Sequence, residues 1–97
     1  MKDVDPKIRK EICEALNKAA VYLHQQAREV VNDPEFCDLE EMYRGDANDY
    51  ESILNSFING RYEEAAKSFC YMDTASRDHI WGLFMTVEAY EAFSDLL

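Results

Sequence analysis

The chain has 97 residues, of which 47% are hydrophobic and 12% aromatic, so it can bury the core of one small domain. Its 20 acids and 10 bases give a net charge of −10, which argues against direct binding to nucleic acid or to an anionic membrane, since both are polyanions. No apolar run reaches the ~20 residues of a membrane span, and the first residues lack the apolar region of a signal peptide. We therefore expect a single cytoplasmic domain over residues 1–97.

The apolar pattern predicts an all-α fold, a compact bundle of about five helices with one long N-terminal helix. Three glycines and two prolines are too few turn residues for a protein of many short strands. Asp5 is a suitable N-cap, and Pro6 is favoured at the first helical position. Apolar residues then recur at spacings of three and four, which predicts one amphipathic helix from Pro6 to Val31.

Two shorter helices are expected next. Asp33 and Pro34 end the first helix and cap a second one, which Gly45 ends. Asn48 caps a third helix, and the pair Asn59-Gly60 ends it. An Asn-Gly pair is also typical of a β-hairpin, but the apolar residues on both sides of this pair follow helical spacing.

The last part of the chain predicts a fourth helix from Arg61 to Met72 and a fifth that starts at Asp73 or Thr74. Across all five helices, the side chains at the inward positions of the apolar pattern should form the core. The expected core members are Ile12, Leu16, Leu23, Phe36, Leu39, Ile53, Leu54, Phe57, Phe69, Ile80, Trp81, Phe84 and Val87.

The negative charge is concentrated in one part of the chain. Residues 29–51 contain nine acids and a single base, Arg44, while the first 18 residues are nearly neutral. One interpretation is a solvated face that keeps the protein soluble; the other is a docking surface for a basic protein. The residues that would bind this partner are Glu35, Asp38, Glu40, Glu41, Asp46, Asp49 and Glu51.

Three of these acids follow one another at a spacing of three. On a helix, Glu35, Asp38 and Glu41 would rise about 4.5 Å per step, close to the ~3.4 Å step of the phosphates of one DNA strand. A helix with this row of carboxylates would therefore imitate a row of phosphates approximately.

The search for catalytic chemistry and metal sites gives no candidates. No phosphate-binding loop, dinucleotide fingerprint, HExxH zinc motif or GxSxG elbow occurs. The stretch that begins at Asp46 starts like a calcium loop, but it has Glu51 where the glycine belongs and Phe57 where the bidentate glutamate belongs. We expect no catalytic residue, no metal and no cofactor, and therefore no enzyme.

The three cysteines, Cys13, Cys37 and Cys70, are an odd number without a CxxC pair. Because each stands among apolar residues, we expect reduced thiols that pack as small core residues. A helix–turn–helix DNA reader would need exposed basic residues on its recognition helix, and the fourth helix offers only Arg61 and Lys67 beside two glutamates.

Two local resemblances add to this interpretation. The segment from Gly60 through Tyr62 and Ala65 to Phe69 resembles the turn and second helix of a tetratricopeptide repeat, but it occurs once, so it implies an antiparallel helix pair and no solenoid. Residues 57–60, with Ala65, Phe69 and a capped helix from Thr74, resemble small acidic helical accessory proteins of phages and plasmids, such as anti-restriction and anti-CRISPR inhibitors. This second resemblance covers about a third of the chain and implies no particular functional residues.

Charge and resemblance together lead to one functional expectation and one alternative. We expect a small acidic binding protein that inhibits or docks on a basic, nucleic-acid-handling protein, for example an anti-CRISPR-like inhibitor carried by a mobile element. The alternative is a structural adaptor or homodimer in which the long first helix pairs with a second copy, with no link to nucleic acid.

Overall fold

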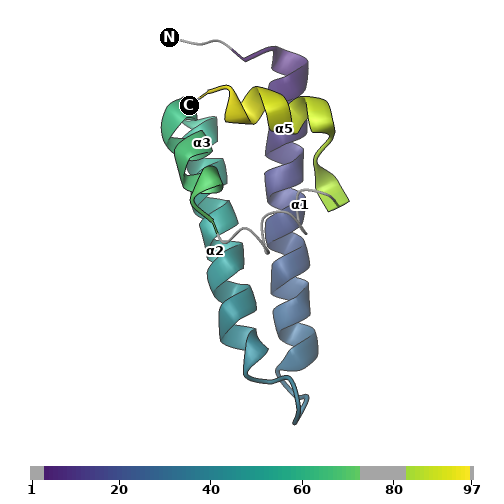
Figure 1. Ribbon diagram of the computed structural model, residues 1–97. Coiled ribbons are helices and arrows are strands. Elements are labelled where there is room, and N and C mark those ends of the chain that lie inside the picture. Colours follow the sequence, from purple (N-terminus) through teal and green to yellow (C-terminus); the bar gives the residue numbers. More distant parts are fainter. Residues whose placement is uncertain (1–3, 73–82, 97) are drawn as a thin grey trace.

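Helices make up most of the computed structural model, which describes residues 4–72 and 83–96 (Figure 1). No strand occurs in these two stretches, so the all-α prediction is confirmed. Within these stretches, the predicted second and third helices are one continuous helix. The helices are α1 (Pro6–Val30), α2 (Leu39–Ile58), α3 (Tyr62–Cys70) and α5 (Val87–Ser94).

Helix α1 begins and ends almost where the sequence predicts. The Asp5 carboxylate accepts a hydrogen bond of 2.8 Å from the backbone N–H of Lys7, and Pro6 occupies the first turn, where its missing N–H costs nothing. The helix ends at Val30, one residue before the predicted end. Its buried face repeats every three or four residues, as expected of an amphipathic helix that lies against a core.

Helix α2 continues through Gly45, where the sequence predicted a break. The predicted end of one helix at Gly45 and the predicted start of the next at Asn48 are therefore both wrong. A glycine inside a helix costs only about 1 kcal/mol relative to alanine. The residues that follow it bury large side chains on the core side of the same helix, Tyr50 and Phe57 among them. Burial of one such side chain contributes roughly 1.5–3 kcal/mol, which exceeds the glycine penalty.

The turn between α2 and α3 forms as predicted. Gly60 has a φ of +82°, a left-handed conformation that glycine adopts without a steric penalty, and its N–H donates to the carbonyl of Phe57. Helix α3 then runs back beside the upper part of α2 (Figure 1), and the rings of Phe57 and Tyr62 lie 4.8 Å apart across the turn. The antiparallel helix pair expected from the repeat-like segment is therefore confirmed, and the β-hairpin is excluded.

Helix α5 starts later than the sequence predicts. Leu83 and Phe84 are helical, Met85 and Thr86 are not, and the Thr86 hydroxyl accepts a hydrogen bond of 3.1 Å from the N–H of Ala89 as a new N-cap. The prediction of one uninterrupted fifth helix through Val87 is therefore wrong for this part of the chain. The predicted start at Asp73 or Thr74 and the core positions Ile80 and Trp81 lie outside the described residues.

The core is a cluster of aromatic and aliphatic side chains at the end of the molecule where all the helices meet. Phe57 and Phe69 flank the ring of Phe93 at centroid distances of 5.5 and 5.1 Å, which joins α2, α3 and α5. Six expected core members are buried, three are partly buried, and Phe36 and Val87 are exposed, so their prediction as core is wrong. The buried six are Ile12, Leu16, Leu23, Ile53, Phe57 and Phe69, and the partly buried three are Leu39, Leu54 and Phe84.

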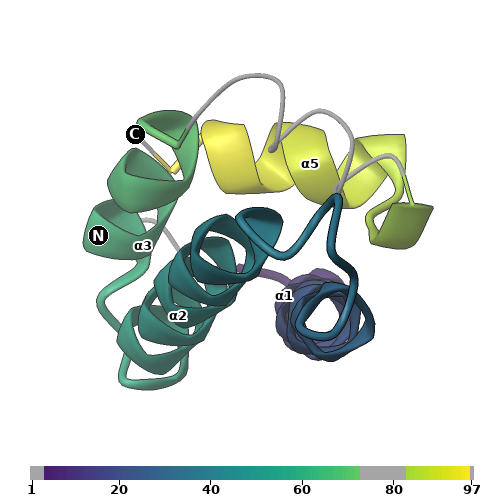
Figure 2. The same cartoon turned by 90° about the horizontal axis from the view of Figure 1, so that it is seen from below.

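The molecule is elongated because two helices are much longer than the others. Its extents are 49 × 20 × 20 Å, and its radius of gyration of 13.8 Å exceeds the about 12.5 Å of an average globular chain of this length. Helix α2 spans about 30 Å, whereas α3 spans about 13 Å and lies beside the upper part of α2 only. Helix α5 crosses the same end of the pair (Figure 2), so the other ends of α1 and α2 project as a two-helix arm.

The continuity of α2 can be tested at its glycine. Gly45 is exposed and helical, and a Cβ placed there meets no atom within 4 Å. Gly45→Ala should therefore raise the free energy of unfolding by about 1 kcal/mol in urea titrations. As a matched control, Gly60→Ala should lower it by about 1 kcal/mol or more, because of the positive φ at that position. A Gly45→Ala variant that loses stability and helical circular dichroism would show that the helix is interrupted there.

Candidate functional site

The segment that joins α1 to α2 is built around the side chain of Asp33. Its Oδ1 accepts hydrogen bonds of 2.8 and 3.2 Å from the backbone N–H groups of Glu35 and Phe36, and its carbonyl accepts one from the N–H of Cys37. The sequence predicted that Asp33 and Pro34 cap a helix that starts here, and this start is wrong, because the residues after Asp33 form turns and α2 begins only at Leu39. The Asp33 side chain orders this run of turns over residues 34–38, which leads into α2. We call residues 31–44, which comprise this segment and the first turns of α2, the hairpin tip.

The hairpin tip exposes large apolar side chains. Phe36 is 47% exposed and Met42 is 50% exposed, and Val31 at the end of α1 is exposed as well. Among the described residues only two helices meet at this end, so no third layer covers these side chains. The sequence pattern marked Phe36 as a core residue because it shares the spacing of the buried positions. Nothing in that spacing shows that the core ends before the tip.

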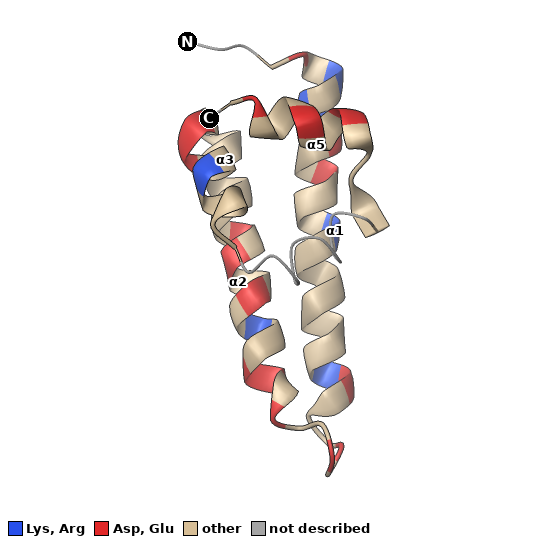
Figure 3. Ribbon diagram, in the orientation of Figure 1, with Lys and Arg blue, Asp and Glu red and all other residues tan. Residues whose placement is uncertain are grey.

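The same tip carries a hollow lined mainly by acidic side chains. A cavity of about 570 Å³ is bordered by Cys37, Asp38, Glu40, Glu41 and Arg44, and red acidic segments dominate this end of the ribbon (Figure 3). The Nε of Arg44 donates to Glu40 at 2.8 Å, one helical turn away. Within the described residues, the carboxylates of Glu35, Asp38 and Glu41 have no such basic partner. The hollow therefore keeps a negative charge that the described residues do not neutralise.

The remaining predicted partner-binding residues lie further along α2 and face different ways. Glu51 reaches across to α1, where its Oε1 lies 2.7 Å from Nε2 of His24, so it is part of a contact between helices. Asp46 is half-buried and has its own interaction within the protein. Asp49 is exposed on the opposite side, toward α3. The seven acids therefore do not form one surface.

The structure also changes the expected row of phosphate-like carboxylates. Glu35 and Asp38 lie in the turn before α2, and only Glu41 lies on the helix. Three carboxylates at regular helical rise are therefore not present at this position. The acidic residues still lie in the predicted part of the chain. Instead of a regular helical row, they flank a turn that carries the exposed Phe36.

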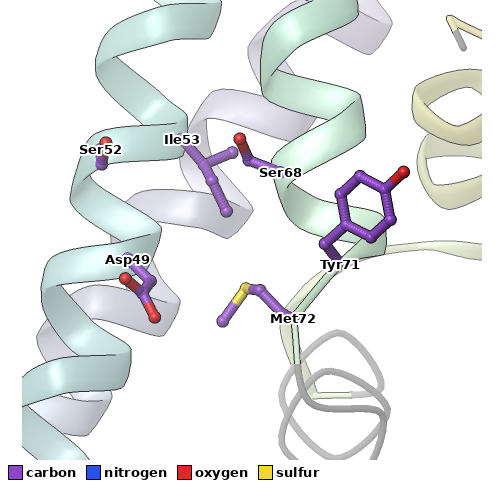
Figure 4. Close-up of a pocket in the computed structure, with 6 residues that line it drawn as sticks. All are labelled: Asp49, Ser52, Ile53, Ser68, Tyr71 and Met72. Atoms are coloured by element: carbon purple, nitrogen blue, oxygen red, sulfur yellow. The ribbon is translucent and has the colours of Figure 1, made fainter.

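A second hollow lies between α2 and α3 (Figure 4). Its volume is about 320 Å³, and Asp49, Ser52 and Ile53 of α2 face Ser68 of α3 and the two residues that follow α3, Tyr71 and Met72. In this group, the sequence predicted a partner-binding role for Asp49 and a core position for Ile53, which is buried. Tyr71 follows the last helical residue, so its high exposure could not be read from helical periodicity. We call this hollow the α2–α3 groove.

The cysteines differ in their surroundings. Cys37 is exposed at the hairpin tip, so its prediction as a core residue is wrong, whereas Cys13 and Cys70 are partly buried. Burial raises the pKa of the Cys13 thiol above its ordinary value, while the nearby Arg9 guanidinium opposes this shift. Cys13 therefore stays protonated, and hence unreactive, over a wider pH range than an ordinary thiol.

The described stretches show neither a metal site nor a helix that could span a membrane. Over residues 4–72 and 83–96, no group of three His, Cys, Asp or Glu side chains is arranged to hold a metal ion. In those stretches, no helix combines the length and the apolar character needed to cross a membrane.

No family model, curated protein or solved structure matches this chain.

The contact between His24 and Glu51 predicts a structural role for that acid. Both side chains are partly exposed, so a double-mutant cycle with His24→Ala and Glu51→Gln should give a coupling of about 0.2–1 kcal/mol in stability. A coupling of zero would show that Glu51 does not help to join α1 and α2.

Proposed function

We propose that this protein is a non-enzymatic binding protein that docks with its hairpin tip on a basic surface of a nucleic-acid-handling protein. The observation that carries the proposal is the exposed ring of Phe36 in a turn with acids on both sides, Glu35 and Asp38, beside a second exposed apolar residue, Met42. Protein interfaces commonly combine a few buried aromatic anchors with a polar rim that excludes water. The hairpin tip has this composition.

The sign of the charge determines the kind of partner. The hairpin tip contains five acids and one base, and that base is already paired with Glu40. Such a surface attracts a positive surface and repels a second copy of itself, so charge disfavours the homodimer through this end. Proteins that handle nucleic acid carry basic surfaces because they neutralise phosphates. A carboxylate-rimmed tip seated there would compete with the nucleic acid, which is how an inhibitor from a mobile element would act.

Helix stability explains part of this charge but not all of it. Glu40 and Glu41 lie in the first turn of α2, where acidic side chains interact favourably with the helix dipole by roughly 0.3–1 kcal/mol. Glu35 and Asp38 precede the helix, and the Asp38 side chain makes no cap hydrogen bond. Helix stability does not require an exposed phenylalanine at position 36 either. Binding to a partner accounts both for the acids that precede the helix and for this exposed ring.

Variants of the hairpin tip test the proposal. The tagged protein should capture a basic protein from its native cell extract, and that protein should elute with increasing salt. Phe36→Ala should reduce the affinity for it at least tenfold, the usual loss at a central aromatic anchor. Glu35→Gln combined with Asp38→Asn should weaken the salt dependence. Both sites are exposed, so the fold should persist.

Matched control variants distinguish specific binding by the hairpin tip from nonspecific hydrophobic binding and from a general effect of net charge. Val87→Ala removes an apolar side chain that is 61% exposed on α5, and Glu14→Gln removes a negative charge from the exposed face of α1. Both variants should bind as the unchanged protein does. Equal losses for Phe36→Ala and Val87→Ala, or capture that salt does not affect, would contradict the proposal. A concentration-dependent mass in light scattering that Phe36→Ala abolishes would instead assign the tip to a second copy of the chain.

A further inference from the structure

The charges of the molecule are divided unequally among its helices. Helix α1 contains five Lys and Arg residues and three acids, whereas α2, α3 and α5 together contain nine acids and two bases. Figure 3 shows this division, with blue segments at both ends and in the middle of α1 and mostly red segments on the other helices. Among the described helices, α1 is therefore the one with a net positive charge.

Most of the bases of α1 lie on the side of the helix that faces away from its buried residues. Val21, which is 54% exposed, marks the middle of this side. At about 100° per residue, the α1 residues after Pro6 that lie within about 60° of Val21 around the helix axis are all exposed. Together with Val21, we call them the α1 outer strip: Lys7, Lys10, Glu14, Asn17, Lys18, Gln25 and Arg28. The strip has four bases and one acid, and it extends over about 32 Å.

The four bases of the strip are available for a partner. Among the described residues, none of them forms an ion pair. Helix α2, with five acids, packs against the opposite side of α1, in a molecule that is 20 Å across. Exposed charges act over only about 10 Å at 0.1 M salt. The local charge of the strip, and not the net charge of −10, therefore decides what binds there.

We propose that the α1 outer strip is a second docking surface, which binds an acidic helix of a partner protein. A helix of about 20 residues spans about 30 Å, so it can follow the strip from Lys7 to Arg28. Its acids lie beside the four bases, and an apolar side chain at its centre covers Val21, as in interfaces that surround an apolar centre with a polar rim. The strip acts independently of the hairpin tip, because the two surfaces attract opposite charges.

Two other occupants fit the strip less well. The hairpin tip of a second copy is acidic, but it is the end of a molecule 20 Å across, so it covers only part of the length of the strip. The phosphates of a nucleic acid strand follow one another every ~3.4 Å, whereas Lys18 and Arg28 are about 15 Å apart along the helix, with Val21 between them. Glu14 also repels a phosphate, while a protein helix can place an uncharged residue opposite it.

The test is a titration of the isotope-labelled full-length chain with a synthetic acidic helix, followed by NMR at about 0.1 M salt. The peptide is based on alanine, with glutamates along one face and a leucine at the centre of that face. Backbone signals of Lys10, Val21 and Arg28 should shift and reach saturation, and the affinity should fall at least tenfold at about 0.5 M salt. Lys18→Glu and Val21→Ser should each weaken binding at least threefold. Glu14→Lys should strengthen it at least threefold, a gain that loss of folding cannot produce.

Matched variants outside the strip separate local binding from an effect of net charge. Lys67→Glu on α3 changes the net charge as Lys18→Glu does, and Ile58→Ser removes an apolar side chain that is 63% exposed at the end of α2. Both variants should bind the peptide within twofold of the unchanged protein.

Several results would overturn the inference. They are unshifted signals along the strip, equal losses for Lys18→Glu and Lys67→Glu, and no gain for Glu14→Lys. Single-stranded DNA that binds the strip as tightly as the peptide would also overturn it, because the strip would then not select a protein helix. A concentration-dependent mass in light scattering that Lys18→Glu abolishes would do so too, because a second copy would then occupy the strip.

Discussion

The aromatic core at one end of the α1–α2 pair is the constraint on which the rest of the structure depends. Phe57, Phe69 and Phe93 come from three different helices, and their contacts hold α3 and α5 against the upper half of the pair. Because α3 has nine residues and α5 has eight, neither can cover the full length of α2. The two long helices therefore extend beyond the core as an arm, and the hairpin tip lies at its end.

Small side chains and a polar contact help to hold this arm together. Ala27 and Ala47 are completely buried although few other side chains surround that end, which indicates that α1 and α2 approach each other closely there. The pair of His24 and Glu51 bridges the helices between this contact and the core. Among the described residues, no third element covers the outer surface of this two-helix arm, so apolar residues at its tip stay exposed. In the proposed function, the exposed Phe36 and the nearby acids form the docking end of this arm.

The sequence allowed much of the fold to be predicted where local signals act alone. Asp5 with Pro6 set the start of α1, and Gly60 set the turn before α3. Prediction failed where packing opposes a local signal. The free-energy penalty of Gly45 inside a helix is smaller than the stabilisation from burying the side chains that follow it, so α2 continues through this position. For the candidate site, the sequence located the acidic residues but did not show which way their side chains face. Those directions follow from the continuity of α2, and the exposure of Phe36 and Tyr71 follows from how far the core extends.

The central claim is that the hairpin tip is the surface that contacts a basic protein partner. Hydrogen–deuterium exchange of the complex with the captured partner tests it directly, because each backbone amide reports its own protection. The account predicts slower exchange in the turn and first helical residues, 35–44, with no change over α5. Protection of α5 or of the outer face of α1, with unchanged exchange over residues 35–44, would contradict it.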